Sequence, residues 1–269
     1  MSAATTLRFK VESVAVWAPT LPGGMIARAA FRGESKPVDP PAKRPAPEIL
    51  PAAERRRAPD SVAIALQVAS DAVRDAGRDP AQLPAIFTSA HGDLSVNDYM
   101  CSTLATAPKA ISPTRFHNSV HNAAAGYWTI ATGCRAASSA VSAFDASFGA
   151  GLLEAVAQCA ADERAVLLVA FDVAAVGALA SVTQSEGLFA AAWVIAPPGD
   201  RPQAPGRSFA ATLVGGPTTP PPLRSAAARE LAGNGMAGAL PFLETLARGD
   251  KQPLDLPLSR SLALRLATP

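Results

Sequence analysis

The sequence predicts an α/β layered fold, and two kinds of segment carry this prediction. Short apolar runs such as 165–171 are typical of strands that are buried on both faces of a sheet. Between such runs lie segments whose apolar residues recur at intervals of three and four, as in 60–76, which is typical of amphipathic helices. Strands that alternate with helices along a chain favour a sheet covered by helices.

The composition excludes several classes of protein. Of the 269 residues, 49% are hydrophobic and 17% are charged, which excludes a chain that is disordered as a whole. The 24 basic and 22 acidic side chains leave a net charge of +2, too small for a dedicated nucleic-acid binder. The three cysteines form no CxxC pair, so neither a disulfide framework nor a structural zinc site is predicted.

The chain shows no signal for secretion or for membrane insertion. The N-terminus lacks the basic and then apolar layout of a signal peptide. The most apolar run, residues 165–182, contains Asp172 and many small residues, so it fits a buried strand and a following loop better than a membrane span. We therefore expect a soluble protein of the reducing cytoplasm.

The first part of the chain predicts one strand, one irregular segment and one helix. The strand is expected at 8–17. Residues 34–59 are so rich in proline that we expect an irregular surface segment there. The helix 60–76 follows, with Asp60 or Ser61 as its N-cap.

The remaining elements follow from the same periodicities, and residues 112–121 are expected to form a polar loop between them. Strands are expected at 85–89, 138–143 (short and buried), 165–171, 188–196, 208–214 and 261–267. Helices are expected at 94–106, 119–133, 146–161, 224–232 and 239–248.

Two patterns imitate ligand sites. Gly233, Gly235 and Gly238 have the spacing of a dinucleotide fingerprint, but that site needs a strand directly before it, and the preceding residues are predicted to be helical. We interpret the glycines as a link between two helices. His117 and His121 are spaced for metal binding on one helical face, but no third ligand lies nearby in the sequence. We interpret them as polar residues of a loop or interface, and we predict no metal site.

Several short motifs occur in a fixed order along the chain. They are Arg55-Arg-Arg57, Asp75-Ala-Gly77, Ile111-Ser-Pro113, Asn122-Ala-Ala-Ala-Gly126, Arg135-Ala-Ala-Ser138 and Ser185-Glu-Gly-Leu-Phe-Ala190. In order and spacing this series resembles the β-ketoacyl-acyl carrier protein synthases of the thiolase superfamily, over about residues 10–215. The resemblance implies a thiolase-like layered fold, with one βαβ-type half of a ketosynthase in residues 1–215 and a short helical and strand C-terminal cap in residues 216–269.

The family's register places Asp145 at the position of the nucleophilic cysteine. Asp145 lies 21 residues before Val166 in the next buried strand, as the family pattern requires, whereas Cys134 lies 32 residues before it. A carboxylate cannot replace a polarizable thiolate in acyl transfer. We therefore expect Asp145 to cap the N-terminus of the following helix, and Cys134 to be a small buried side chain.

The family's two catalytic histidines lie in a C-terminal half for which the residues after 215 leave no room. The histidines of this chain, His91, His117 and His121, all precede Asp145. This pattern resembles the short chain-length-factor proteins of aryl polyene and related polyketide or fatty-acid-like pathways. The resemblance implies a non-catalytic subunit without cofactor. It would pair with an active ketosynthase, help to shape the acyl tunnel, and meet the acyl carrier protein only indirectly.

The same resemblance implies which residues face the partner or the acyl pocket. They are Ser89, His91 and Gly92 in a turn that lines this subunit's own pocket, and Thr114, Arg115, Phe116, His117, Asn118 and His121 near the interface. Two alternatives stay open at this point. One is a divergent acyl-thioester transferase or hydrolase that uses Cys134 or Asp145. The other is a homodimer with a binding role.

Overall fold

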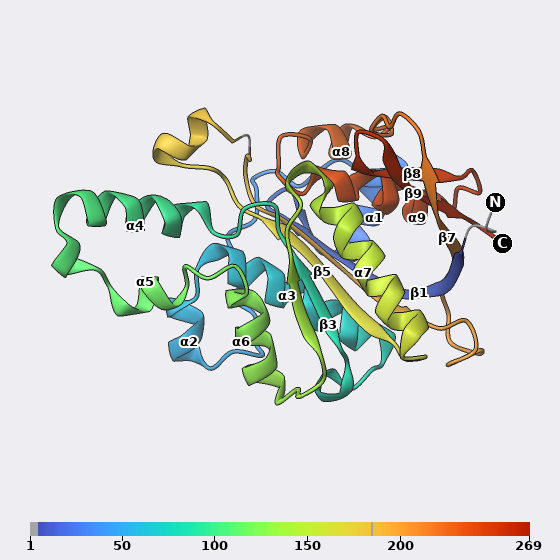
Figure 1. Cartoon of the computed structure of the whole chain (residues 1–269), viewed down its shortest axis with the longest axis horizontal. Helices are drawn as coiled ribbons and strands as arrows, with labels where there is room; N and C mark the ends of the chain where they lie inside the picture. Colours follow the sequence, from blue (N-terminus) through green and yellow to red (C-terminus); the bar gives the residue numbers. More distant parts are fainter. Residues whose placement is uncertain (1–4, 184) are drawn as a thin grey trace.

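The computed structural model describes residues 5–183 and 185–269, which form a mixed nine-stranded sheet with helices on both faces (Figure 1). The strands are β1 (Thr6–Ala18), β2 (Leu21–Pro22), β3 (Ala85–Thr88), β4 (Ser138–Val141), β5 (Val166–Asp172), β6 (Phe189–Ala196), β7 (Arg207–Gly215), β8 (Leu254–Ser259) and β9 (Leu262–Ala267). The α-helices are α1 (Gly24–Arg32), α2 (Ala52–Arg57), α3 (Asp60–Ala76), α4 (Leu94–Thr106), α5 (Pro113–His117), α6 (Ala123–Thr132), α7 (Ser147–Ala161), α8 (Ala226–Glu230) and α9 (Leu240–Arg248).

The strand order is β4-β3-β5-β6-β1-β7-β9-β8, with β2 paired to the end of β1. Strands β4, β3 and β5 run parallel to one another, and the other neighbouring strands pair antiparallel. Every residue of β5 and β6 is buried. Both strands are continuous apolar runs because helices cover both faces of the sheet at this point. The predicted α/β layered fold is therefore confirmed.

Alternate residues of each central strand enter two separate cores. On β5, Leu167 and Val169 pack with α3 and α6, whereas Leu168 and Ala170 pack with α7 and with the layer of α1, α8 and α9. This alternation follows from the two-residue period of a strand. Aromatic rings fill the second core, where Trp193 lies 5.1 Å from Phe148 and 6.2 Å from Phe242.

Residues 216–269 continue the same sheet. Strand β9 pairs with β7, and β8 pairs with β9 at the edge. Helix α9 packs on α1 and contributes Leu240, Phe242 and Leu243 to the second core. The segment thus shares its hydrophobic core with the first strand of the chain.

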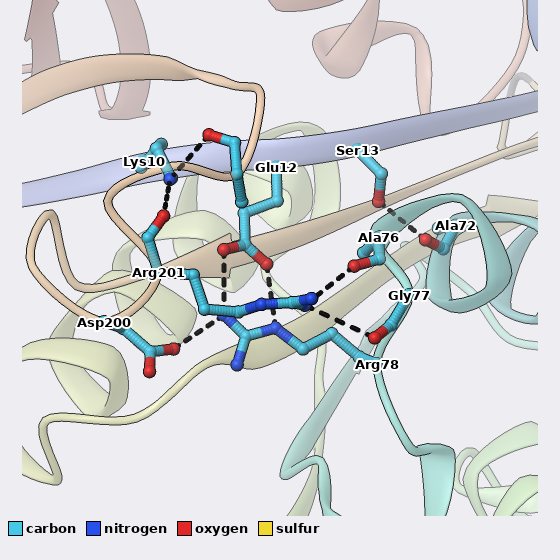
Figure 2. Close-up of polar contacts among 10 residues, drawn as sticks. Lys10, Glu12, Ser13, Ala72, Ala76, Gly77, Arg78, Asp200 and Arg201 are labelled. Carbon is cyan, nitrogen blue, oxygen red and sulfur yellow. Dashed lines mark hydrogen bonds and ion pairs between the residues drawn. The ribbon is translucent and has the colours of Figure 1, made fainter.

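An ionic network joins β1, the end of α3 and the loop between β6 and β7 (Figure 2). Arg78 donates two hydrogen bonds of 2.8 Å to Glu12 and one of 2.6 Å to Asp200. Arg201 donates to the carbonyl of Ala76 at 2.9 Å, and Lys10 donates to the carbonyl of Arg201 at 2.7 Å. The Glu12 side chain at the centre of this network is only 2% exposed, whereas Asp200 and Arg201 lie at the surface.

Most predicted helices and strands are confirmed to within a few residues, but four elements differ. Helix α1 was not predicted, although its buried residues Ala27, Ala30 and Phe31 have helical spacing. The proline-rich segment is irregular only up to Pro51, since α2 follows within it. The predicted loop 112–121 contains α5, with Ser112 as its N-cap. Strand β8 was missed, because Pro257 lies within it.

Three smaller expectations are wrong. The predicted helix 119–133 begins at Ala123. Neither Asp60 nor Ser61 caps α3, whose N-cap residue is Pro59. Strand β4 is not buried, because it forms one edge of the sheet and Ser138 and Ala140 are exposed. Within the described residues, no helix is both long and apolar enough to cross a membrane.

Candidate functional site

Helices α4 and α5 form an arm that projects from the body of the protein (left in Figure 1). Leu94 and Val96 in the first turn are the buried residues of α4, and the rest of the helix is exposed or half-buried. Later in the arm, Leu104 on α4 is 53% exposed and Phe116 on α5 is 63% exposed. The arm therefore carries large apolar side chains without a core of its own to bury them.

Hydrogen bonds fix the root of the arm. Oδ1 of Asp93 accepts from the backbone N–H groups of Ser95 and Val96 at 3.1 and 3.0 Å, which caps α4. The other carboxylate oxygen accepts from the Ser61 hydroxyl at 2.7 Å, and Ser61 lies in the first turn of α3. The arm is thus tied to the body through a buried carboxylate.

A second set of contacts holds the two helices of the arm together. The Tyr99 hydroxyl on α4 accepts from the backbone N–H of Ser112 at 2.9 Å. The Arg115 guanidinium on α5 lies 4.2 Å from the centre of the Tyr99 ring, in a cation–π contact. These contacts give the arm a defined shape despite its exposure.

Exposed apolar side chains gather on the elements around the arm. Seven of the nine large apolar side chains that are exposed among the described residues lie on α4–α6, in the turn between α5 and α6, in the turn after β4 or in the loop after β5: Leu104, Phe116, Val120, Ile130, Phe144, Val176 and Val182. We call these seven residues the arm set. The other two, Met25 and Leu213, lie on α1 and β7. Clustered apolar exposure marks an interaction surface, whereas single exposed residues do not.

Strand β4 is the terminal strand at one end of the sheet. Among the described residues its one neighbouring strand is β3, and it contains neither proline nor a charged residue. Such an edge presents unpaired backbone N–H and C=O groups that another strand can bind. A second molecule could thus form hydrogen bonds with the free edge and pack apolar side chains against the arm set.

The structure places the predicted interface residues on the arm or at its root. Thr114, Arg115, Phe116 and His117 lie on α5 and are exposed, whereas Asn118 is buried at the end of the helix. The His117 ring contacts Tyr127 at 6.1 Å, edge to face. Helix α5 ends at His117, and His121 lies in the following turn. The two histidines therefore do not share a helical face.

The turn from Ser89 to Gly92 lies at the carboxyl end of β3. Ser89 is fully buried there. Its hydroxyl donates to Asp172 at 2.7 Å and accepts from the backbone N–H of Gly92 at 2.8 Å. Its carbonyl oxygen lies 3.1 Å from Nε2 of His121 and accepts a hydrogen bond from it. Gly92 has a φ of 69°, which favours glycine at this tight turn.

His91 joins the turn to two neighbouring segments. Its Nε2 lies 2.6 Å from the Thr183 hydroxyl in the loop between β5 and β6. Its ring contacts that of Phe144 edge to face at 5.9 Å. His91 and His121 thus come from different segments but meet at the same turn.

Asp172 is a central residue of this site that sequence reasoning did not single out. It ends β5, is fully buried, and accepts from the backbone N–H of Ala90 at 2.8 Å as well as from Ser89. Burial raises the pKa of the Asp172 carboxyl, and the hydrogen bonds from Ser89 and Ala90 oppose this shift. The signal in the sequence was an acidic residue at the end of an otherwise apolar strand.

A strained turn connects β4 to α7. Phe144 has a φ of 48° and its side chain is 73% exposed, an unusual combination for a bulky residue. The Ser147 hydroxyl holds the turn, because it accepts from the backbone N–H of Ala143 at 2.9 Å and donates to the carbonyl of Phe144 at 2.6 Å. Hydrolases of the α/β class carry their nucleophile at a strained strand-to-helix turn. Here that position holds a phenyl ring, which has no nucleophilic atom.

The two candidate nucleophiles show no sign of activation. Asp145 is exposed, and its carboxylate makes no hydrogen bond within the described residues, so the expectation that it caps α7 is wrong. Cys134 is 8% exposed, and its thiol donates to the carbonyl of Leu83 at 3.3 Å. The thiol therefore faces a carbonyl oxygen, which is not a general base that could activate it.

The interpretation of the three glycines as a link is confirmed, because they lie between α8 and α9. Gly235 also packs against Asp172, where a Cβ atom would lie 3.0 Å from Oδ2 of that residue. In residues 5–183 and 185–269, no three side chains of His, Cys, Asp or Glu lie close enough to share a metal ion.

Residues 31–230 match the family model described as the N-terminal domain of β-ketoacyl synthases. No curated protein sequence matches the chain. Among solved structures, the chain is similar to one in the complex of the ketosynthase ApeO with its chain length factor ApeC from Xenorhabdus doucetiae. The identity is 24% and the TM-score 0.74, over 97% of this chain and 99% of that one.

Two further structures show the same fold at lower identity. A chain of the ishigamide ketosynthase/chain length factor is 14% identical with a TM-score of 0.70, over 97% of this chain and 99% of that one. A β-ketoacyl synthase from Burkholderia phymatum is 13% identical with a TM-score of 0.59, over 78% of this chain and 63% of that one. The thiolase-like ketosynthase fold is therefore shown.

Proposed function

The chain belongs to the family of β-ketoacyl synthase N-terminal domains, and from this we propose that it is a non-catalytic subunit that binds an active ketosynthase. The projecting arm carries the proposal. The two helices of the arm contact each other but have no core of their own, so their apolar side chains stay exposed to water. Exposure of apolar surface to water is unfavourable in free energy. Burial against a second subunit removes that cost.

The free edge of β4 supports the same proposal. A strand of the partner can add to this edge, so that main-chain hydrogen bonds continue the sheet across the interface. Ile130 on α6 and Phe144 beyond β4 would then be covered on either side of the added strand. Apolar anchors beside a hydrogen-bonded edge are the combination expected of a stable interface.

The similar structures indicate the kind of partner. Two of them come from complexes of a ketosynthase with a chain length factor, and in both cases the match spans nearly all of both chains. We therefore assign the partner as a ketosynthase, in a pathway that builds a polyketide, aryl polyene or fatty-acid-like chain in the cytoplasm. The acyl carrier protein would meet this subunit through the ketosynthase.

The site supports a structural contribution to the reaction. Phe144 lies at the strained turn, the Asp145 carboxylate does not cap α7, and the Cys134 thiol donates a hydrogen bond to a carbonyl. We propose that the subunit stabilises the ketosynthase. The exposed residues of α5, Phe116 foremost, would close the acyl tunnel on the side of the interface and limit the length of the chain.

Co-expression with the ketosynthase followed by size-exclusion chromatography tests the pairing. We expect one heterodimer peak, and a chain that elutes alone or only as a homodimer would contradict the proposal. The enzyme alternative is tested by incubating the purified chain with malonyl- and acyl-carrier protein and measuring condensation, decarboxylation and hydrolysis. Turnover that Cys134→Ala or Asp145→Ala abolishes would overturn the non-catalytic assignment.

A further inference from the structure

A buried polar junction lies beneath the proposed interface, and Asp172 is at its centre. Three segments meet at this residue. They are the turn Ser89–Gly92, the loop that follows β5, and the glycine-rich link after α8. The segments are far apart in the sequence, so their relative placement depends on these contacts.

Both carboxylate oxygens of Asp172 are used in the first contact. Oδ1 accepts from the Ser89 hydroxyl at 2.7 Å, and Oδ2 accepts from the backbone N–H of Ala90 at 2.8 Å. Because Ser89 and Asp172 are fully buried, water cannot replace either bond. The Ser89 hydroxyl also accepts from the N–H of Gly92, so it links Asp172 to the far end of the turn.

The other two segments close over the same carboxylate. The Ser185 hydroxyl donates to the carbonyl of Val173 at 2.7 Å and accepts from the N–H of Gly235 at 3.1 Å. The Asn234 amide donates to the carbonyl of Glu186 at 2.9 Å. Gly235 itself leaves no room for a side chain beside Asp172. These bonds join the loop and the link to each other and to the backbone beside Asp172, while the carboxylate itself accepts from the turn.

The turn that Asp172 holds carries the contacts of two histidines. His121 donates to the carbonyl of Ser89, and His91 lies between Thr183 and the ring of Phe144. Both histidines are half-buried at the root of the arm, next to members of the arm set. A shift of the turn would move both imidazoles and the exposed ring of Phe144.

We propose that Asp172 is a positioning residue, whose carboxylate fixes the Ser89–Gly92 turn and thereby places His91 and His121 at the surface that the partner ketosynthase covers. The statement about the partner rests on the proposed function. The statement about the two histidines does not. The two can be tested separately.

Nuclear magnetic resonance of the imidazole protons tests the first statement on the chain alone. The chain contains only three histidines, so each ring gives a separate signal. Asp172→Asn replaces one carboxylate oxygen by an NH2 group, which cannot accept from Ser89 or Ala90. We expect the His91 and His121 signals to move, and the signal of His117, which lies on the arm and contacts Tyr127 of α6, to stay. Unmoved signals of His91 and His121 would overturn the proposal.

The affinity for the ketosynthase tests the second statement. We expect Asp172→Asn to weaken binding about tenfold at a temperature where the variant is fully folded, because the interface must realign the turn. The matched control is Asp200→Asn, the same substitution in the ionic network at the other end of α3, which should leave the affinity unchanged. Equal affinities of wild type and Asp172→Asn would overturn this part.

A second, milder variant keeps the test valid if Asp172→Asn fails to fold. Ser89→Ala removes the hydroxyl that links Asp172 to Gly92 but leaves the bond from Ala90. It should move the same two histidine signals and weaken binding in the same direction. If the wild-type chain fails to bind any ketosynthase, the proposed function falls, while the histidine spectra still decide whether Asp172 positions the turn.

Discussion

The two ends of helix α3 differ in their surroundings: an ionic network within the chain surrounds one end, and the exposed arm adjoins the other. At its carboxyl end, Arg78 donates to Glu12 and Asp200, and every charge in this ionic network has a partner within the chain. At its amino end, Ser61 anchors the carboxylate of Asp93, and from there the arm extends into solvent with exposed apolar side chains. One end is completed by the chain itself. The other end has the properties of a surface that a second molecule completes.

The largest expected effect comes from a charge in the arm set. Phe116→Asp places a carboxylate where we propose that the partner buries a phenyl ring, and an unpaired buried charge costs about 4 kcal/mol. We expect association with the ketosynthase to be lost in isothermal titration calorimetry, while the melting temperature of the isolated chain stays the same.

Leu213→Asp is the control for this variant. Leu213 is 47% exposed on β7, outside the arm set, so the same change of side chain should leave association intact. Equal loss of binding in both variants would mean that the arm is not the contact surface.

At the opposite end, Glu12→Gln should act on stability rather than on binding. It leaves the half-buried Arg78 without its bidentate partner, at a cost of about 3 kcal/mol in the free energy of unfolding. Calorimetry should show a lower Tm, and the affinity of the folded chain for its partner should not change.

Asp255→Asn serves as the control for Glu12→Gln. Asp255 also accepts two hydrogen bonds from one arginine, Arg265, but this pair is exposed, so its loss should barely move Tm. A drop in Tm of similar size in both variants would show that burial does not increase the contribution of the ionic network to stability.

A smaller effect, of opposite sign, is expected at the strained turn. Phe144→Gly removes a bulky residue from a positive φ, which should stabilise the isolated chain by about 1 kcal/mol. The same variant should bind the ketosynthase more weakly, because an exposed apolar anchor is gone. Chemical denaturation of the chain alone and titration with the partner separate the two effects. A destabilised Phe144→Gly would show that packing of the ring on His91 outweighs the strain.

The smallest effects concern the reactivity of the cysteines. Burial raises the pKa of the Cys159 thiol to about 12, so this cysteine should react with iodoacetamide only after unfolding. Cys101 is exposed on α4 and should react at once in the free chain. Binding of the ketosynthase should slow the reaction of Cys101 in a mass-spectrometric time course. A rate that stays the same would place the contact away from α4.

The amino-acid sequence predicts the interior of this fold better than its surface. Strands β5 and β6 are continuous apolar runs, and such runs have few alternatives to a central position in a sheet. Strand β4 was expected in place but not at an edge, because a short alternating segment looks the same in both positions. Helix α1 was missed because the prolines and glycines before it hid three buried residues with helical spacing.

The candidate site was predictable only in part. The resemblance to ketosynthases indicated the residues of α5, and the structure places four of them on the exposed arm. The bond between Ser89 and Asp172 joins residues 83 positions apart, and periodicity carries no information at that range. The resemblance to ketosynthases placed Asp145 at the position of the nucleophile, whereas the strained residue of the turn is its neighbour Phe144.

The position of β1 in the sheet also sets the order of events during synthesis. Strand β1 is made before its two long neighbours in the sheet, β6 and β7, which end at Ala196 and Gly215. Until those residues leave the ribosome, β1 has only the two-residue β2 to pair with. The nascent chain must therefore carry β1 without its long neighbours until β6 has emerged, and sequestration of that strand by a chaperone would favour productive folding.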